Sequence, residues 1–357
     1  MEYGPVRSKM SDRARAMCAA ANAAVAEHDR VDKLFKRSCH DVDAHLFADV
    51  EGFPLNAVGD LVWFDLDERS KIERLIVRLL RYDKAHSGGR APDVWHCLLS
   101  SVYPFMTSWG IDKMLLALVL RTLHNRAKGR CWVQYIEYAC GRGNLSKAAL
   151  RRGLRGVSFD KIYSSSHDVL TIAGLRLWLL ALAASLPKCL VWHGTQCSSF
   201  VTLSLSQSLR YKENDWLGDQ DKLFVKVGNM LADITGLTMC LAFLMDGVEV
   251  LEQPLNSRMP LTPCLRAALV FTCAQKITTY HSCFGGETLK PLQLWSSCSM
   301  MTALARDRPI VMRSDAVLAR RDKNGGFTGV KHLLLESQAY TLQFGDAVIS
   351  ALLSSSS

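Results

Sequence analysis

The chain has 357 residues, of which 49% are hydrophobic and 22% charged, with a formal net charge of +9 and a pI of about 9.0. This balance excludes a largely disordered protein, and the length allows one large domain or two ordinary ones. The positive charge favours an anionic partner such as nucleic acid or a membrane surface, although many basic enzymes bind no polyanion.

The twelve cysteines are scattered, with no CxxC pair and no zinc-finger spacing to histidine, so we expect no metal site. The N-terminus lacks the apolar core of a secretory signal, which predicts an intracellular protein, cytoplasmic or nuclear, with reduced thiols. Apolar runs such as Leu177–Leu186 and Leu237–Met245 are shorter than the roughly 18–20 residues of a spanning helix, so we expect no membrane span.

Residues 1–126 are predicted to form a mainly helical N-terminal region. Apolar residues recur at helical spacing over residues 70–85, and the pattern returns over residues 110–129, where Gly129 ends it. We expect a helical extension packed on a catalytic core. A partner-binding module is the alternative, but no particular residue supports it.

Strand-like and helix-like segments alternate from Cys131 onward, within a predicted α/β core spanning residues 127–300. The expected strands cover residues 132–139, 156–160, 189–194 and 247–254, and the expected helices cover residues 144–153, 170–186 and 220–245. This alternation predicts a mostly parallel, doubly wound sheet with helices on both faces. In such sheets, ligands bind at the carboxyl ends of the strands.

A glycine-containing loop follows the first expected strand. Gly141 and Gly143 allow the backbone to approach a ligand, and the helix after them directs its N-terminal amides at the loop. Asp160 ends the next strand, where an acid can bind both hydroxyls of a ribose. The dinucleotide-binding fingerprint G-x-G-x-x-G requires a third glycine at position 146, where this chain has serine. The loop therefore suits a nucleoside better than a pyrophosphate. A tight turn without a ligand is the alternative.

This segment resembles the class I S-adenosylmethionine-dependent methyltransferases, whose first motif is E/D-x-x-x-G-x-G. Glu137, Gly141 and Gly143 match that motif, and Asp160 matches the ribose-binding acid. Asp168 stands where the family often has an acid near the adenine. The resemblance implies a Rossmann-like methyltransferase fold and S-adenosylmethionine as the cofactor.

The stretch VWHGTQCSSF, residues 191–200, narrows the resemblance to the cytosine-5 nucleic-acid methyltransferases. Gly194, Cys197 and Phe200 resemble the motif G-x-P-C-x-x-F/W, although Gln196 replaces the proline. In that family the cysteine thiolate adds to carbon 6 of the pyrimidine and makes carbon 5 nucleophilic. The alternative is that Cys197 is a small buried residue in a strand-end loop.

The next strand ends in Glu252, Gln253 and Pro254, where the family has E-N-V or E-N-P. The resemblance implies that Glu252 hydrogen-bonds the base and assists the thiolate addition. Gln253 departs from the pattern. A carboxylate at an apolar strand end is costly without a partner, which favours a functional interpretation of Glu252.

Two weaker matches follow in family order. Phe284, Gly285 and Lys290 resemble an F-G-x-P-x-R/K segment on the following strand, and residues 345–348 resemble a G-N-x-V segment beside the cofactor. The matches span Glu137 to about Val348.

Residues 301–357 are predicted to form a short basic segment and a C-terminal helix that returns to the core. Within residues 306–331, seven arginines and lysines stand against three aspartates. The basic side chains expected to bind substrate are Lys290, Arg320, Arg321 and Lys323. Such a stretch suits a phosphate backbone, and an ordinary basic surface loop is the alternative.

Three functions therefore compete. The first is cytosine methylation of nucleic acid with Cys197 and Glu252 as catalytic residues. The second is S-adenosylmethionine-dependent methylation of another substrate, with Asp168 or His193 as the polar participant. The third is a non-catalytic methyltransferase-like binding or structural protein, which Gln196 and Gln253 favour.

Overall fold

A computed structural model of the chain describes residues 23, 26–27, 29–36, 131–309, 319–321, 327–329 and 338–354. Its centre is a mixed sheet of six strands in the order β2-β1-β3-β4-β6-β5. The strands are β1 (Val133–Tyr138), β2 (Gly156–Phe159), β3 (Ser185–His193), β4 (Val248–Pro254), β5 (Gln275–Tyr280) and β6 (Pro291–Ser296).

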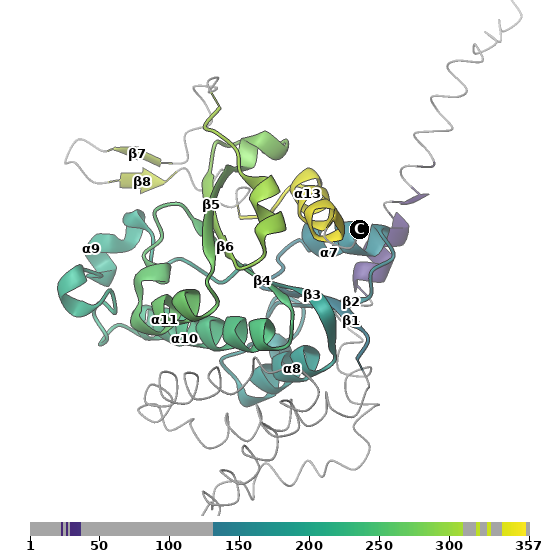
Figure 1. The fold of residues 1–357 in the computed structure, drawn as a ribbon. Coiled ribbons are helices and arrows are strands. Elements are labelled where there is room, and N and C mark those ends of the chain that lie inside the picture. Colours follow the sequence, from purple (N-terminus) through teal and green to yellow (C-terminus); the bar gives the residue numbers. More distant parts are fainter. Residues whose placement is uncertain are drawn as a thin grey trace, which may run out of the picture.

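Strands β1 to β4 pair in parallel, and β6 runs antiparallel between β4 and β5. The main helices are α7 (Asn144–Arg151), α8 (Ile172–Ala183), α10 (Leu223–Leu244), α11 (Pro263–Phe271) and α13 (Leu342–Leu353). The predicted α/β fold with a mostly parallel sheet and helices on both faces is confirmed at this level (Figure 1).

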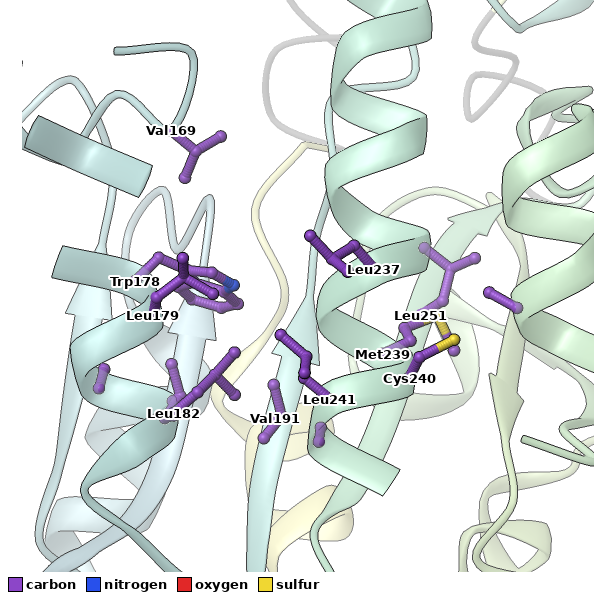
Figure 2. Packing of buried hydrophobic residues seen from close by; sticks show 14 of the residues in the cluster. Val169, Trp178, Leu179, Leu182, Val191, Leu237, Met239, Cys240, Leu241 and Leu251 are labelled. Atoms are coloured by element: carbon purple, nitrogen blue, oxygen red, sulfur yellow. The ribbon is translucent and has the colours of Figure 1, made fainter. Parts of the chain in front are cut away.

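The two faces of the sheet are covered by different helices because neighbouring residues of a strand point to opposite sides. In β1, Ile136 joins a core with α8 and α10, whereas Tyr135 joins a second core with α7 and α13. Figure 2 shows the first core, in which Trp178 and Leu182 of α8 and Leu241 of α10 gather over the sheet.

Helix α10 is the one described helix that is long and apolar enough to cross a membrane, over Leu223–Phe243. The apolar run recognised in the sequence, Leu237–Met245, is thus the second half of a longer helix. Of the most apolar window of α10, 61% is buried inside the fold, as in a core helix.

Strand β3 begins earlier than the sequence indicated. The expected helix reached residue 186, but α8 ends at Ala183 and β3 starts at Ser185, before Pro187. The pairing with β1 shifts register between Val133, opposite Ser185, and Tyr135, opposite Leu190. A proline is tolerated in a strand at such an irregularity, because no ladder hydrogen bond is needed there.

Strand β1 is the point at which the chain changes direction across the sheet. Its neighbours are β2, reached through α7, and β3, reached through α8 on the opposite face. A crevice outside the carboxyl ends of the strands is expected at such a switch point, between β1 and β3.

The N-terminal prediction is described only in part. Residues 29–36 are helical and lie against the loop after β1, whereas the expected helices at 70–85 and 110–129 lie outside the described residues. The domain boundaries proposed from the sequence stay predictions.

Candidate functional site at the carboxyl ends of β1, β3 and β4

The loop after β1 takes a conformation that favours glycine. Ala139, Gly141 and Gly143 all have positive φ, at 54°, 52° and 65°. A Cβ added to Gly141 would meet nothing within 4 Å, whereas one added to Gly143 would lie 2.0 Å from Cζ of Phe35. Gly141 therefore offers the open backbone position, and Gly143 is covered by the N-terminal helical segment.

Asp160 lies beside this loop, where the sequence placed it. Its Oδ2 accepts a hydrogen bond of 2.9 Å from the Gly141 amide, and its Oδ1 accepts one of 3.1 Å from Ile162. Each carboxylate oxygen can accept a further bond, so the group remains able to receive ribose hydroxyls. Tyr163 adds a second link, because its hydroxyl donates to the Gly141 carbonyl.

Glu137 has an internal role. Its side chain is fully buried and accepts hydrogen bonds from the amide and the hydroxyl of Ser146, in the first turn of α7. Burial raises the pKa of Glu137 to about 7. Within the described residues its Oε1 has no hydrogen-bond partner. Glu137 thus fastens α7 to β1, and its contact with a cofactor stays a prediction.

Asp168 caps the turn before α8. Its Oδ1 accepts a hydrogen bond of 3.0 Å from Leu170, and the residue is partly buried. Burial raises the pKa of the Tyr138 hydroxyl, and the charges of Asp168 and Asp160 raise it further. Both carboxylates therefore lie within electrostatic range of the end of β1.

Cys197 lies in the loop after β3, within electrostatic range of Glu252 and Lys290. The thiol is partly exposed, and its pKa is raised to about 11 by desolvation and by the negative charge of Glu252. The positive charge of Lys290 acts in the opposite direction. The structure thus brings together three residues that the sequence assigned to one site, and at neutral pH it favours the thiol over the thiolate.

Glu252 is buried at the end of β4 and bonds to a residue from the C-terminal part of the chain. Its Oε2 accepts a hydrogen bond of 2.9 Å from the Tyr340 hydroxyl, which in turn accepts one of 3.1 Å from Nε1 of Trp192. Its Oε1 is buried without a hydrogen-bond partner among the described residues. A Cβ on Gly194 would lie 3.1 Å from the Tyr340 hydroxyl, so the hydroxyl that joins the ends of β3 and β4 also lies against the start of the Cys197 loop.

Gln253 and Gln196, the two departures from the family motif, have different surroundings. Gln253 is fully buried, where its Nε2 donates to the Thr195 carbonyl at 2.8 Å and its Oε1 accepts from Ser257 at 2.8 Å. It thereby links the loops after β3 and β4. Gln196 is exposed, and its amide lies 3.4 Å from the Ser198 hydroxyl.

His193 is a packing residue at the end of β3. Its ring is buried and lies edge-on to Trp178, with centroids 5.6 Å apart. Burial lowers the pKa of His193 to about 3, so the imidazole is neutral and a weak base. This argues against the alternative in which His193 acts as the base.

The basic residues expected to bind substrate are only partly described. Lys290 directly precedes β6 and is partly buried. Arg320 and Arg321 lie in β7 (Ala319–Arg321), which pairs with β8 (Phe327–Gly329), and Lys323 lies outside the described residues. Strand β8 lies near η2 (Thr202–Ser204), just after the loop that carries Cys197.

The segments of the two weaker matches lie beside the sheet. Phe284 and Gly285 are in the turn after β5 instead of on a strand. Gly345 in α13 packs so closely on α7 that a Cβ would lie 2.6 Å from the Asn144 carbonyl. Asp346 pairs with Arg151 of α7 at 2.8 Å.

Sequence reasoning missed three residues that shape this site: Phe35, Arg210 and Tyr340. Phe35 and Tyr340 reach the strand ends from distant parts of the chain, and no motif marks them. Arg210 carried a weak signal, as an arginine in an otherwise uncharged stretch from Val201 to Tyr211.

No family model matches the sequence, and no curated protein matches it significantly. Among the described residues, no group of three or more histidines, cysteines, aspartates or glutamates could hold a metal ion.

Proposed function

We propose that the protein transfers a methyl group from S-adenosylmethionine to a cytosine of nucleic acid, with Cys197 as the nucleophile. The observation that carries this proposal is the placement of Cys197 and Glu252 at adjoining strand ends, within electrostatic range of each other and of Lys290. The parallel strands β1 to β4, with the glycine loop after β1, support a Rossmann-like methyltransferase fold.

The residues present fit the cofactor at the glycine loop. The open side of Gly141 leaves room for a ligand against the backbone, and Asp160 stands beside it with acceptor capacity for ribose hydroxyls. Asp168, like Asp160, lies within electrostatic range of Tyr138 at the end of β1. When bound, S-adenosylmethionine supplies an electrophilic methyl group for carbon 5 of the base.

The protein's own residues prepare the base. The Cys197 thiol gives its proton to solvent, and the electron pair of its sulfur forms a bond to carbon 6 of a cytosine turned out of the stack. Glu252, in its protonated form, shares a proton with ring nitrogen 3 and so accepts the electron density that moves into the ring. After carbon 5 has been methylated, it gives its proton to a solvent base and the carbon 5–carbon 6 double bond re-forms. The carbon–sulfur bond then breaks, its electron pair leaves with the Cys197 sulfur, and ring nitrogen 3 returns its proton to Glu252.

The raised pKa of Cys197 sets a condition on this mechanism. At neutral pH the free protein holds a thiol, so deprotonation must accompany binding of the nucleic acid. A phosphate backbone brings negative charge, which does not lower the thiol pKa. We therefore infer that Glu252 must be protonated or hydrogen-bonded to the base for the thiolate to form.

The same pKa favours a second candidate, a non-catalytic methyltransferase-like binding or structural protein. In that case Cys197 remains a thiol, and the Tyr340 hydroxyl keeps Glu252 as part of a structural chain of hydrogen bonds. Methylation of a substrate other than nucleic acid stays a third possibility, with Asp168 as the remaining polar participant.

Covalent trapping separates the candidates. The wild type, Cys197→Ser and Cys283→Ser are incubated with a 5-fluorocytosine oligonucleotide and S-adenosylmethionine, and covalent complexes are counted by denaturing gel. We expect a complex with the wild type and with Cys283→Ser, whose changed residue is exposed, but none with Cys197→Ser. Cofactor binding without any complex in the wild type would favour the non-catalytic candidate.

A further inference from the structure

Arg210 has a fully buried side chain and uses every donor of its guanidinium group. Nε donates to the Ser199 carbonyl at 2.9 Å, and Nη1 donates to the Trp216 carbonyl and to Asn229 Oδ1, both at 2.7 Å. Nη2 donates to the Ser199 hydroxyl at 2.9 Å and to the Val225 carbonyl at 3.2 Å. These bonds satisfy all five N–H groups of an arginine.

None of these partners carries a charge, so within the described part of the chain the cation is balanced by dipoles alone. Burial lowers the pKa of Arg210 to about 10, and the group remains a cation at neutral pH. Burying a charge without an opposite charge is costly. Replacing buried charged groups with apolar side chains of similar size often leaves a protein no less stable. The planar fork of arginine fixes several acceptors at once, which an apolar side chain does not do.

Two of these hydrogen bonds join Arg210 to Ser199, in the segment that directly follows Cys197. Ser199 and Phe200 follow Cys197 by two and three residues, and the Phe200 amide donates to the Cys197 carbonyl at 2.8 Å. The guanidinium also stacks on the Phe200 ring, 3.7 Å from its centroid. On the other side, Gly228 of α10 approaches so closely that a Cβ would lie 2.2 Å from the Ser199 hydroxyl.

We propose that Arg210 is a positioning residue, which ties the Cys197 loop (residues 194–201) to α10 and holds the thiol where it meets its substrate. This inference rests on the proposed function for its catalytic consequence. The fastening itself is a property of the free protein, and it can be tested without turnover.

The first test measures the alkylation of individual cysteines by iodoacetamide, followed by peptide mass spectrometry of the full chain. In Arg210→Lys and Arg210→Met, we expect Cys197 to react several-fold faster than in the wild type, while the buried Cys189 and Cys240 stay protected. Ile349→Ala, a change in α13 within the second core, which contains no residue of the Cys197 loop, serves as the control for lost stability, and its Cys197 should react at the wild-type rate. An unchanged Cys197 rate in the Arg210 variants, or equal exposure of all three cysteines, would overturn the proposal.

Gly228→Ala gives an independent route to the same loop. Alanine stabilises a helix interior relative to glycine, so the substitution does not weaken α10 itself. The new methyl group must, however, displace Ser199. We expect the same selective exposure of Cys197. Protection equal to that of the wild type would show that the loop is not held by its contact with α10.

The second test measures the rate of covalent complex formation with the 5-fluorocytosine oligonucleotide at saturation. Arg210→Lys should lower this rate about 100-fold, since small misplacements of a reacting group cost about that much. The Kd values for the oligonucleotide and for S-adenosylmethionine should be unchanged. An unchanged trapping rate would overturn the positioning role. If the wild type forms no complex, the proposed function fails, and the alkylation test still decides whether Arg210 fastens the loop.

Discussion

The hydroxyl of Tyr340 donates a hydrogen bond of 2.9 Å to Oε2 of Glu252, across 88 residues of sequence. Tyr340 is partly buried, and its pKa is raised by desolvation and by the charge of Glu252, so the phenol stays protonated. Trp192 donates to the same hydroxyl. Tyr340, from the C-terminal part of the chain, therefore links the ends of β3 and β4 and supports the residue proposed to act on the base.

Tyr340→Phe tests this link. The change leaves Glu252 Oε2 and the Trp192 indole without their partner, so we expect a loss of about 1–3 kcal/mol in the free energy of unfolding. Urea denaturation measures it, with Tyr211→Phe at a 43% exposed tyrosine as the control. Equal stability of Tyr340→Phe and the wild type would mean that water replaces the hydroxyl at no cost.

The parallel core could be predicted from the sequence because each of its strands is a short apolar run bounded by glycine, proline or a polar residue. Parallel strands share one carboxyl edge, which is why Asp160, Cys197 and Glu252 were expected at one edge of the sheet. Strand β5 was not predicted, because the solvent-facing residues at its start, Gln275 and Lys276, weaken its apolar pattern. The resemblance implied a strand near β6, but not that it runs antiparallel between β4 and β5.

The contacts that complete the site could not be predicted, because they depend on tertiary packing between segments far apart in the chain. Phe35, Tyr340 and Arg210 have no fixed spacing from the residues they contact. From the sequence alone, Gln253 showed only that the asparagine of the E-N-V or E-N-P motif is replaced. The structure adds that its side chain spans from Thr195 to Ser257, a role that its position in the sequence does not reveal.

Phe35 should hold the glycine loop in place. Its ring covers Gly143 and lies edge-on to Tyr163 at 5.6 Å, and Asp32 in the same helical segment pairs with Lys147 of α7 at 2.7 Å. Phe35→Ala removes a buried ring, so we expect faster hydrogen exchange at the amides of Gly141 and Gly143. The control is Phe224→Ala, where the ring is 39% exposed. Unchanged exchange would show that the loop keeps its conformation without the helical segment.

Asp160→Ala should weaken S-adenosylmethionine binding by about 1–3 kcal/mol, the cost of losing hydrogen bonds to a charged group. The carboxylate also accepts the Gly141 amide, so part of this loss comes from a looser loop. Calorimetric titration measures the affinity, and Asp221→Ala, at an exposed position before α10, is the control. Equal affinity in wild type and Asp160→Ala would place the ribose elsewhere.

Glu137 should make stability fall as the pH rises. Its pKa is raised from 4.5 to about 7 in the folded protein, so between these values the folded state holds a proton that the unfolded state has lost. The stabilisation is complete below about pH 4.5 and is lost as the pH rises through 7. The total is about 3.5 kcal/mol, because each pKa unit corresponds to about 1.4 kcal/mol.

Glu137→Gln removes this titration while leaving an oxygen for the Ser146 amide. Urea unfolding at pH 5 and pH 8 should show the wild type losing about 2.5 kcal/mol relative to the variant. Taking the difference between the two proteins cancels the titration of groups that they share. Parallel pH curves would mean that Glu137 does not titrate in this range. Glu287→Gln, at an exposed position, should leave the pH dependence unchanged.

Glu252 should control the reactivity of Cys197. We expect it to slow the reaction of the thiol with iodoacetamide but to be required for its reaction with a cytosine. Its negative charge raises the thiol pKa, so Glu252→Gln should lower that pKa and speed alkylation of Cys197 by iodoacetamide at pH 8. The same variant cannot share a proton with the ring of a cytosine, so covalent trapping of the 5-fluorocytosine oligonucleotide should be lost.

In the wild type, alkylation of Cys197 should rise about tenfold per pH unit between pH 7 and 10, because the thiolate fraction does so below a pKa of about 11. Glu287→Gln serves again as the control, with both rates at the wild-type level. If Glu252→Gln leaves the alkylation rate unchanged, the two side chains are too far apart to act on one base, and the cysteine mechanism loses its structural support.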